Sequence, residues 1–264
     1  MRTLVSEGVD ERPDAAGSDE SSPTASLLAP VAVAVAVAAG LVLRFVATSP
    51  LWLDEALSAN IAVLPVGDLL DALRHDGHPP FYYLLLHGWM QVVGEGDVAV
   101  RSLSGLFAVA TLPLVWVAGR RLAGVSGGRW ALVVFALSPY SVRYATETRM
   151  YSLVMLLVVA GYLLVPDALR RPTAARLVGI ALLSGLLLLT HYWSFYLLAA
   201  VGLVLVARGW RRPDDRGAVA RVLVAMAAGG LLFVPWLGGF LYQAGHTGTP
   251  WGSPYRPTEL VQTT

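Results

Sequence analysis

The strongest constraint on this chain is a series of long apolar blocks. A transmembrane helix needs about 20 apolar residues, and these blocks approach or reach that length. Hydrophobic residues make up 56% of the chain and charged residues 14%, with a mean hydropathy of +0.61. A soluble domain carries roughly 25% charged residues, so too little polar surface remains for an aqueous exterior. The sequence predicts an all-α, polytopic helical membrane protein. The blocks are 27–47, 98–118, 129–145, 150–166, 177–190, 192–207 and 219–241.

Composition excludes several kinds of site. The chain has no cysteine, which removes disulfides, zinc fingers, iron–sulfur centres and cysteine nucleophiles. The formal net charge is +1, and all 19 basic residues are arginine. No basic domain is present, so nucleic acid is not expected as a partner.

The segment 79–93 decides how the chain crosses the membrane. It has about 15 residues, which is short for a span and suits a helix lying at the membrane surface. If it is such an interfacial helix, 11 arginines of three loops lie on the N-terminal side, against four on the other side. Cytoplasmic loops are enriched in arginine, so this arrangement is favoured. We therefore predict about seven spans, a cytoplasmic N-terminus and an interfacial helix in the first outside loop.

Three regions follow from this reading. Residues 1–26 are polar and acidic and are expected to form a disordered cytoplasmic tail. Residues 27–241 form the membrane module, and 242–264 begin an outside loop at which the chain is expected to be truncated. Arg44, near the outer end of the first span, is expected to snorkel to the surface.

The first outside loop carries two adjacent carboxylates, Asp54 and Glu55, directly after the first span. Charged groups at a bilayer surface are costly and often functional, although an acidic pair also suits the first turn of a helix. The same loop holds His78 before Pro79 and Pro80, which fix an extended backbone. Either His78 is structural or it belongs with the acidic pair.

The second outside loop combines arginine, glutamate and tyrosine. Arg143, Glu147, Arg149 and Tyr151 lie between two spans, on the side that the positive-inside rule disfavours for arginine. A guanidinium pairs well with phosphate, so the loop could bind a phosphate at headgroup depth. The alternative is that these side chains only anchor the loop to lipid headgroups.

The remaining polar positions give weaker indications of function. The turn at 191–193 reads as part of an aromatic belt. No ligand spacing requires a metal or another cofactor, although Asp54, Glu55 and His78 could form an oxygen-and-nitrogen site for a divalent metal.

Five short motifs in order resemble one known family. They are Leu-Trp-Leu-Asp-Glu at 51–55, His-Pro-Pro-Phe-Tyr-Tyr at 78–83, Arg-Ser-Leu-Ser at 101–104, Gly-Arg-Arg-Leu at 119–122, and Ser-Pro at 138–139 followed by Glu-Thr-Arg-Met-Tyr at 147–151. Over roughly 50–200, the chain resembles the GT-C superfamily of membrane glycosyltransferases. Within it, the chain is most similar to the protein mannosyltransferase and aminoarabinose-transferase-like group, glycosyltransferase family 39.

The resemblance implies a fold, an activity and site residues. It implies a GT-C-like N-terminal module that moves a mannose-like or other sugar from a polyprenyl-phosphate carrier to an acceptor hydroxyl, with inversion, on the outer face of the plasma membrane. The acceptor, whether protein, lipid or polysaccharide, is unspecified. Asp54 matches the expected general base, with Glu55 beside it. Arg149 and Arg143 are the expected phosphate ligands, and His78, Glu147 and Tyr151 complete the expected carrier and sugar site.

Two other functions fit the same composition. One is a transporter or flippase for a lipid-linked sugar, which should place polar groups at mid-membrane depth. The other is an inactive, truncated partner of a second chain. Polar residues gather at the outer ends of the blocks rather than at their centres, which favours the enzyme.

Overall fold

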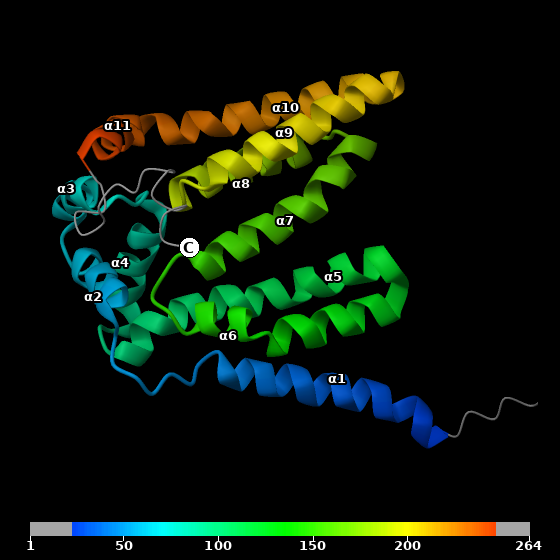
Figure 1. Cartoon of the computed structure of the whole chain (residues 1–264), viewed down its shortest axis with the longest axis horizontal. Helices are drawn as coiled ribbons and strands as arrows, with labels where there is room; N and C mark the ends of the chain where they lie inside the picture. Colours follow the sequence, from blue (N-terminus) through cyan, green and yellow to red (C-terminus); the bar gives the residue numbers. More distant parts are fainter. Residues whose placement is uncertain (1–22, 247–264) are drawn as a thin grey trace, which may run out of the picture.

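The structure is a computed structural model that describes residues 23–246, with side chains from residue 30 onward. Within this range the chain forms helices and no strand. The long helices run roughly side by side, and three short helices gather at one end of them (Figure 1). The prediction of an all-α helical protein is confirmed.

The first helix, α1, spans Pro23–Leu43. It begins before the boundary predicted at residue 27, so residues 23–26 of the expected disordered tail are helical; the remainder of that tail lies outside the described residues. Gly40 lets α1 approach the second arm of α5 closely. A Cβ at this position would lie 2.5 Å from the carbonyl oxygen of Ala136.

Arg44 follows α1 and is buried, with 1% of its surface exposed, so the prediction that it snorkels is wrong. Its guanidinium donates to the carbonyls of Gly40, Phe135 and Ala136 at 2.7–2.9 Å, and to Ser141 Oγ at 2.6 Å. These carbonyls lie near the C-terminal ends of two helices, which carry partial negative charge. Arg44 therefore joins α1 to α5 instead of reaching water.

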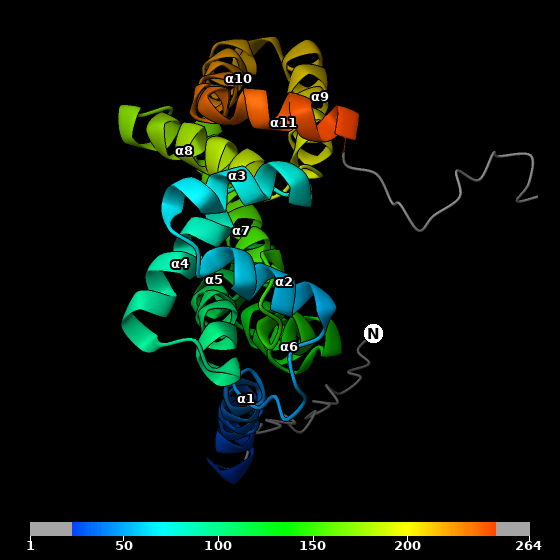
Figure 2. The same cartoon turned by 90° about the vertical axis from the view of Figure 1, so that its left-hand side faces the viewer.

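The segment predicted as the first outside loop folds into three short helices, α2 (Leu53–Ala62), α3 (Val66–Asp76) and α4 (Phe81–Val93). Helix α3 ends at Gly77, whose φ of 88° lies in the left-handed region that glycine adopts readily. Pro79 and Pro80 then lead into α4. Viewed from this end, α3 lies beside α11 (Figure 2).

Helix α5 (Asp97–Leu137) is 41 residues long but is not one straight rod. Backbone angles at Ala123 and Gly124 leave the helical region, and the chain reverses there into two antiparallel arms (Figure 1). The arms touch at Gly119, where a Cβ would lie 2.6 Å from the Cβ of Ala131. The two apolar blocks predicted on either side of this turn therefore form two separate helical arms, and the second arm ends at Leu137 rather than at 145. Whether each arm crosses the membrane stays a prediction.

The next helices alternate in direction. Helix α6 (Pro139–Ala145) is short, and α7 (Tyr151–Arg170), α8 (Ala174–Thr190) and α9 (Ser194–Arg211) are joined by short loops. The predicted turn at 191–193 joins α8 to α9.

The last described helices form one continuous stretch. They are the short 3-10 turn η1 (Pro213–Asp215), then α10 (Arg216–Gly229), η2 (Gly230–Trp236) and α11 (Leu237–His246). The outside loop is predicted to begin at residue 242, and α11 continues past this point to His246. The side of the membrane on which this end lies stays a prediction. Residues 247–264 lie outside the described part.

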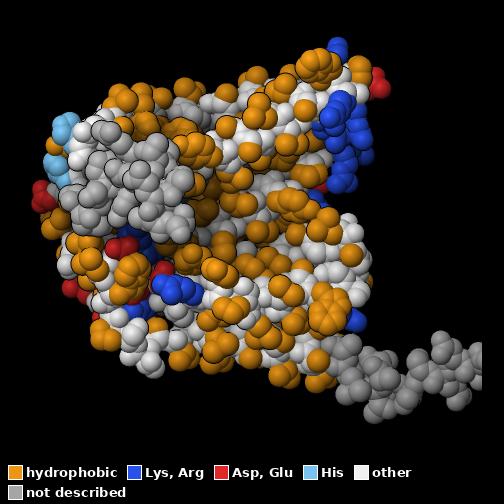
Figure 3. All heavy atoms as spheres, in the orientation of Figure 1, with side chains coloured by type: hydrophobic (Ala, Val, Ile, Leu, Met, Phe, Trp, Pro, Cys, Tyr) orange, Lys and Arg blue, Asp and Glu red, His pale blue; other side chains and the backbone are white. Residues whose placement is uncertain are grey.

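Among residues 23–246, four helical stretches are long and apolar enough to cross a membrane, and Pro30–Leu43 and Ala174–Thr190 are apolar but shorter. The three arginine-rich loops lie at the end of the bundle opposite α2, α3 and α4 (Figure 1), and blue side chains gather there on the surface (Figure 3). The arginine count predicted this separation. The total of seven spans, the depth of α4 and the cytoplasmic side stay predictions. The four stretches that are long and apolar enough to cross a membrane are Asp97–Leu137, Tyr151–Arg170, Ser194–Arg211 and Pro213–His246.

The main core lies under the three short helices. Leu69, Leu73, Tyr82, Tyr83 and Leu86 are completely buried there. Apolar burial fixes α3 and α4 against α5, α7 and α8. The polar residues at the same end are therefore held on a rigid base.

Candidate functional site

Asp54 and Glu55 lie in the first turn of α2, where the helix dipole favours acidic side chains. Although adjacent, they have different surroundings. Glu55 is 1% exposed, whereas Asp54 is partly exposed. The acidic pair therefore separates into one buried carboxylate and one accessible carboxylate.

Glu55 forms a two-point ion pair with Arg101 of α5. Arg101 Nε donates to Oε1 at 2.8 Å and Nη2 donates to Oε2 at 2.6 Å. The backbone N–H groups of Thr148 and Trp52 donate to the same carboxylate. Burial alone would raise the pKa of Glu55, but these hydrogen bonds and the charge of Arg101 lower it below its ordinary value.

Arg101 also holds the loop that follows α1. It donates to the carbonyl oxygens of Ser49 at 2.7 Å and Pro50 at 3.1 Å. Through Glu55 and Thr148, one ion pair thus connects the first outside loop, α5 and the second outside loop.

Asp54 takes part in these contacts only through its backbone. Its carbonyl accepts from Ser58 Oγ at 2.8 Å and from Arg149 Nη1 at 3.5 Å. Within residues 23–246 its carboxylate has no hydrogen bond or ion pair, so it is available to a ligand. Its negative charge acts on the neighbouring guanidinium of Arg149.

Arg149 lies at the centre of the polar cluster and is 4% exposed. Nη1 donates to Ser58 Oγ at 3.1 Å, and Nη2 lies 2.9 Å from His78 Nε2. Its Nε is buried and has no partner among the described residues. Burial alone would lower the pKa of Arg149, but electrostatic interactions with Tyr83 and Tyr151, and then with Asp54 and Asp76, raise it. The guanidinium is therefore a fixed cation with one donor unused.

His78 connects Arg149 to a carboxylate. Arginine can only donate, so His78 Nε2 accepts from it and the imidazole proton lies on Nδ1. That nitrogen is 2.7 Å from Asp76 Oδ2, which also accepts from Tyr83 Oη at 2.9 Å. Burial favours a higher pKa for Asp76, yet the hydrogen bonds from His78 and Tyr83 keep it below its ordinary value. The result is a fixed Asp76–His78–Arg149 chain.

Arg143, in α6, pairs with Glu147, four positions later in the loop that follows, with Arg143 Nε 2.8 Å from Glu147 Oε1. The side chain of Arg143 is 66% exposed, and that of Glu147 is 9% exposed. Burial raises the pKa of Glu147. These two residues lie at the edge of the cluster, and Arg143 does not touch Arg149 in any described contact.

Tyr151 begins α7, and its ring lies 4.7 Å from that of Tyr144 and 6.0 Å from that of His191. It therefore links the second outside loop to the turn between α8 and α9. The turn predicted to be only an aromatic belt lies beside the site.

The three residues considered for a metal are not brought together as a ligand set. In the described part of the chain, no group of three or more His, Asp or Glu side chains could hold a metal ion. Glu55 is paired with Arg101, and His78 lies between Asp76 and Arg149.

Four residues of the cluster had no assigned role from the sequence. Arg101 appeared only within a motif, and its position at the start of an apolar block was the available signal. Asp76, Ser58 and Gln243 gave none, because their contacts depend on folding of distant segments. Gln243 of α11 donates to the carbonyls of Leu73 and His78.

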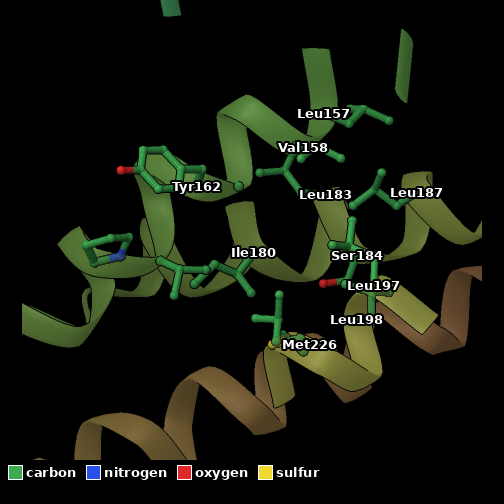
Figure 4. A pocket seen from close by; sticks show the side chains of 14 residues that line it. Leu157, Val158, Tyr162, Ile180, Leu183, Ser184, Leu187, Leu197, Leu198 and Met226 are labelled. Atoms are coloured by element: carbon green, nitrogen blue, oxygen red, sulfur yellow. The ribbon is translucent and has the colours of Figure 1, made fainter. Parts of the chain in front are cut away.

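A large cavity lies deeper, between α7, α8, α9 and α10. It has a volume of about 300 Å³, and its lining is almost wholly apolar (Figure 4). Leu197 lines both this cavity and a second one near Tyr151. The two cavities are therefore neighbours, and the second lies beside Tyr151.

Comparison with known proteins gives one match. The family model described as dolichyl-phosphate-mannose-protein mannosyltransferase matches residues 77–238, more than half of the chain. No curated protein and no solved structure matches significantly. The match includes His78, Arg101 and Arg149, while Asp54 and Glu55 precede it and are tied to it by the contacts above. The chain belongs to the dolichyl-phosphate-mannose-protein mannosyltransferase family, and is a membrane glycosyltransferase of the GT-C type.

Proposed function

We propose that this protein transfers a sugar, with inversion, from a polyprenyl-phosphate carrier to an acceptor hydroxyl at the outer face of the plasma membrane. The observation that carries the proposal is the pairing of an available carboxylate with a fixed cation. Asp54 has no side-chain partner in the described chain, and the adjacent Arg149 keeps one donor unused. A displacement at a sugar phosphate needs these two groups.

The reaction assigns one role to each. Asp54 accepts the proton of the acceptor hydroxyl, whose oxygen forms a bond to the anomeric carbon. The bond from that carbon to the carrier phosphate breaks, and the phosphate leaves with the electron pair. Arg149 stabilises the charge that develops on the phosphate. His78 orients Arg149, and Tyr151 is the supporting donor.

Glu55 has a different role in this proposal. Its carboxylate already accepts from Arg101, Thr148 and Trp52. A carboxylate saturated in this way is a poor base, because its proton affinity is lowered and no lone pair faces a substrate. We assign Glu55 to holding the loops in place.

The apolar cavity of Figure 4 supports a lipid carrier. Its wall is formed by side chains such as Leu157, Ile180 and Leu198, with few polar atoms. An isoprenoid chain would replace lipid contacts there without burying unsatisfied polar groups. A transporter of lipid-linked sugars would instead need polar contacts at this depth for the sugar.

The decisive experiment is transfer of radiolabelled sugar in proteoliposomes. Wild-type protein is incubated with a panel of polyprenyl-phosphate sugars and membrane acceptors, beside Asp54→Asn. Product formed by the wild type and lost in the variant supports the proposal. Movement of the intact lipid-linked sugar across the bilayer without transfer would instead identify a flippase. Transfer that requires a second chain would identify a partner subunit, and repetition with a chelator tests the need for a divalent metal.

A further inference from the structure

A second cavity, of about 340 Å³, lies at the outer ends of α7 and α9. The mechanism above uses Tyr151 but not the cavity itself. In the space-filling view, the surface is hollowed between the upper helices and α7 (Figure 3). The cavity is lined by Tyr144, Tyr151, Val154, Met155, His191, Trp193, Ser194 and Leu197.

Ser194 is the first sign that this cavity binds something polar. The residue is 3% exposed, and its Oγ has no hydrogen-bond partner in the described chain. A buried hydroxyl without a partner destabilises a protein, so such groups call for an explanation. A ligand hydroxyl inside the cavity would supply the missing partner.

His191 provides a second neutral hydrogen-bonding group. Its Nδ1 accepts from the backbone N–H of Trp193 at 3.1 Å, which places the ring proton on Nε2. Burial lowers the pKa of His191, and the positive charge of Arg149 lowers it further. The imidazole is therefore uncharged near neutral pH and offers an N–H donor.

Aromatic rings and aliphatic side chains form the rest of the lining. Tyr144 and Tyr151 lie side by side, and Trp193 is 74% exposed. The apolar wall consists of Val154, Met155 and Leu197. A sugar ring has apolar C–H faces that pack on such surfaces and hydroxyls that bond to the few polar groups.

The absence of charged side chains from the cavity lining limits the charge that a bound sugar can carry. The lining includes no aspartate, glutamate or arginine. The cation Arg149 lies close enough to act electrostatically on two lining residues, His191 and Tyr151. An ammonium group would be repelled by that cation, and a sugar carboxylate would find no ionic partner in the cavity.

We infer that the cavity between α6, α7 and α9 holds the sugar of the donor, and that it selects an uncharged sugar. The inference rests on the proposed function, in which Arg149 binds the phosphate to which that sugar is attached. Ser194 and His191 then contact sugar hydroxyls, and the ring packs against Tyr144 and Tyr151. The cavity adds donor-sugar recognition to a site whose polar cluster handles the phosphate.

The competing occupant is the first isoprene unit of the carrier, because Leu197 lines both cavities. A sugar and an isoprene unit in this cavity should respond differently when the hydroxyl of Ser194 is removed. Loss of Ser194 Oγ should weaken binding of a sugar, but should leave an isoprene unit bound as well or better.

The experiment measures two affinities for purified full-length protein in nanodiscs. The probes are polyprenyl phosphate and polyprenyl-phosphate mannose. We expect the sugar to tighten binding to the wild type, and Ser194→Ala to reduce this gain about three- to tenfold, the loss expected for one neutral hydrogen bond. Affinity for bare polyprenyl phosphate should not change. Ser184→Ala, a buried serine that lines the deeper cavity, should leave the ratio of the two affinities at its wild-type value.

Charge selectivity is measured with carriers that bear an amino sugar or a uronic acid. Neither should bind more tightly than bare polyprenyl phosphate. Three results would overturn the assignment of the cavity to the sugar while leaving the proposed function intact. They are equal gains in affinity from neutral and charged sugars, an unchanged ratio of the two affinities in Ser194→Ala, and an equal effect of that variant on both probes. If neither probe binds the wild type, the proposed function fails and this assignment with it.

Discussion

Glu55 and Arg101 face each other across 46 positions of sequence as a two-point ion pair almost fully removed from water, with side-chain exposures of 1% and 6%. Removing one partner from such a pair leaves an uncompensated buried charge. The pair therefore constrains which substitutions the first outside loop tolerates.

The first prediction concerns stability. Glu55→Gln should destabilise the protein by about 3–5 kcal/mol, because Arg101 loses its counter-charge while remaining buried. The measurement is thermal unfolding in detergent. The matched control is Asp54→Asn at the next position, which should melt within a few degrees of the wild type. A Glu55→Gln variant as stable as the wild type would contradict the role given to the pair.

The second prediction gives the pH dependence of that stability. The pKa of Glu55 is lowered in the folded protein, so its contribution is fully present above its ordinary value of 4.5 and is lost as pH falls through the lower folded value. The gap in melting temperature between wild type and Glu55→Gln should stay constant from pH 7 to about 4.5 and narrow below it. A gap that widens in acid would have the wrong sign.

The third prediction tests the base. Asp54→Asn keeps the size of the side chain but cannot accept a proton, so turnover should fall by about 10²–10⁴-fold while donor binding is retained. Single-turnover kinetics and donor affinity are measured on the same preparation. Wild-type turnover in this variant would remove Asp54 from the mechanism.

The fourth prediction separates phosphate binding from anchoring. Arg149→Lys keeps the charge but loses the planar fork that contacts Ser58 and His78. Donor binding should weaken in Arg149→Lys and weaken further in Arg149→Ala, by about 1–3 kcal/mol.

The control for that series is Arg74→Ala, which removes an exposed arginine whose ion pair within residues 23–246 is with Asp71. Its donor affinity should equal that of the wild type. If the two Arg149 variants also bind like the wild type, Arg149 serves only to hold the loop.

The fifth prediction concerns topology. If α4 lies along the surface, a reporter fused after Gly94 should label on the same side as one fused after Gly67. Labelling on opposite sides would make α4 a span and reverse the sidedness of every later loop.

Features of the fold that depend on local composition could be predicted from the sequence, whereas contacts between distant segments could not. Apolar blocks and arginine-rich loops depend on local composition, so helices, the turn at 191–193 and the grouping of the loops could be read directly. The reversal at Gly124 was implied by the polar gap between two blocks. Residues 138–145 read as the end of a span, but Ser138 and Pro139 start the separate helix α6.

The sequence could predict which types of residue belong to the candidate site, but not which side chains each of them contacts. Asp54 and Glu55 look alike in sequence, and only the approach of Arg101 separates a saturated carboxylate from an available one. Arg44 was expected at the surface because arginine there usually reaches water. The carbonyl groups that bury it come from Phe135 and Ala136, which no local pattern connects to it.

The contacts of Gln243 have a consequence for biogenesis. Its side chain joins the carbonyls of Leu73 and His78, which lie 170 and 165 positions earlier in the chain, and its Oε1 accepts from Tyr192. During synthesis the segment that carries His78 is therefore made well before Gln243, which braces it. A nascent chain arrested before α11 thus carries every charged residue of the cluster but lacks the clamp that fixes their spacing. The polar cluster therefore gains this brace only after α11 has been synthesised and has packed against α3.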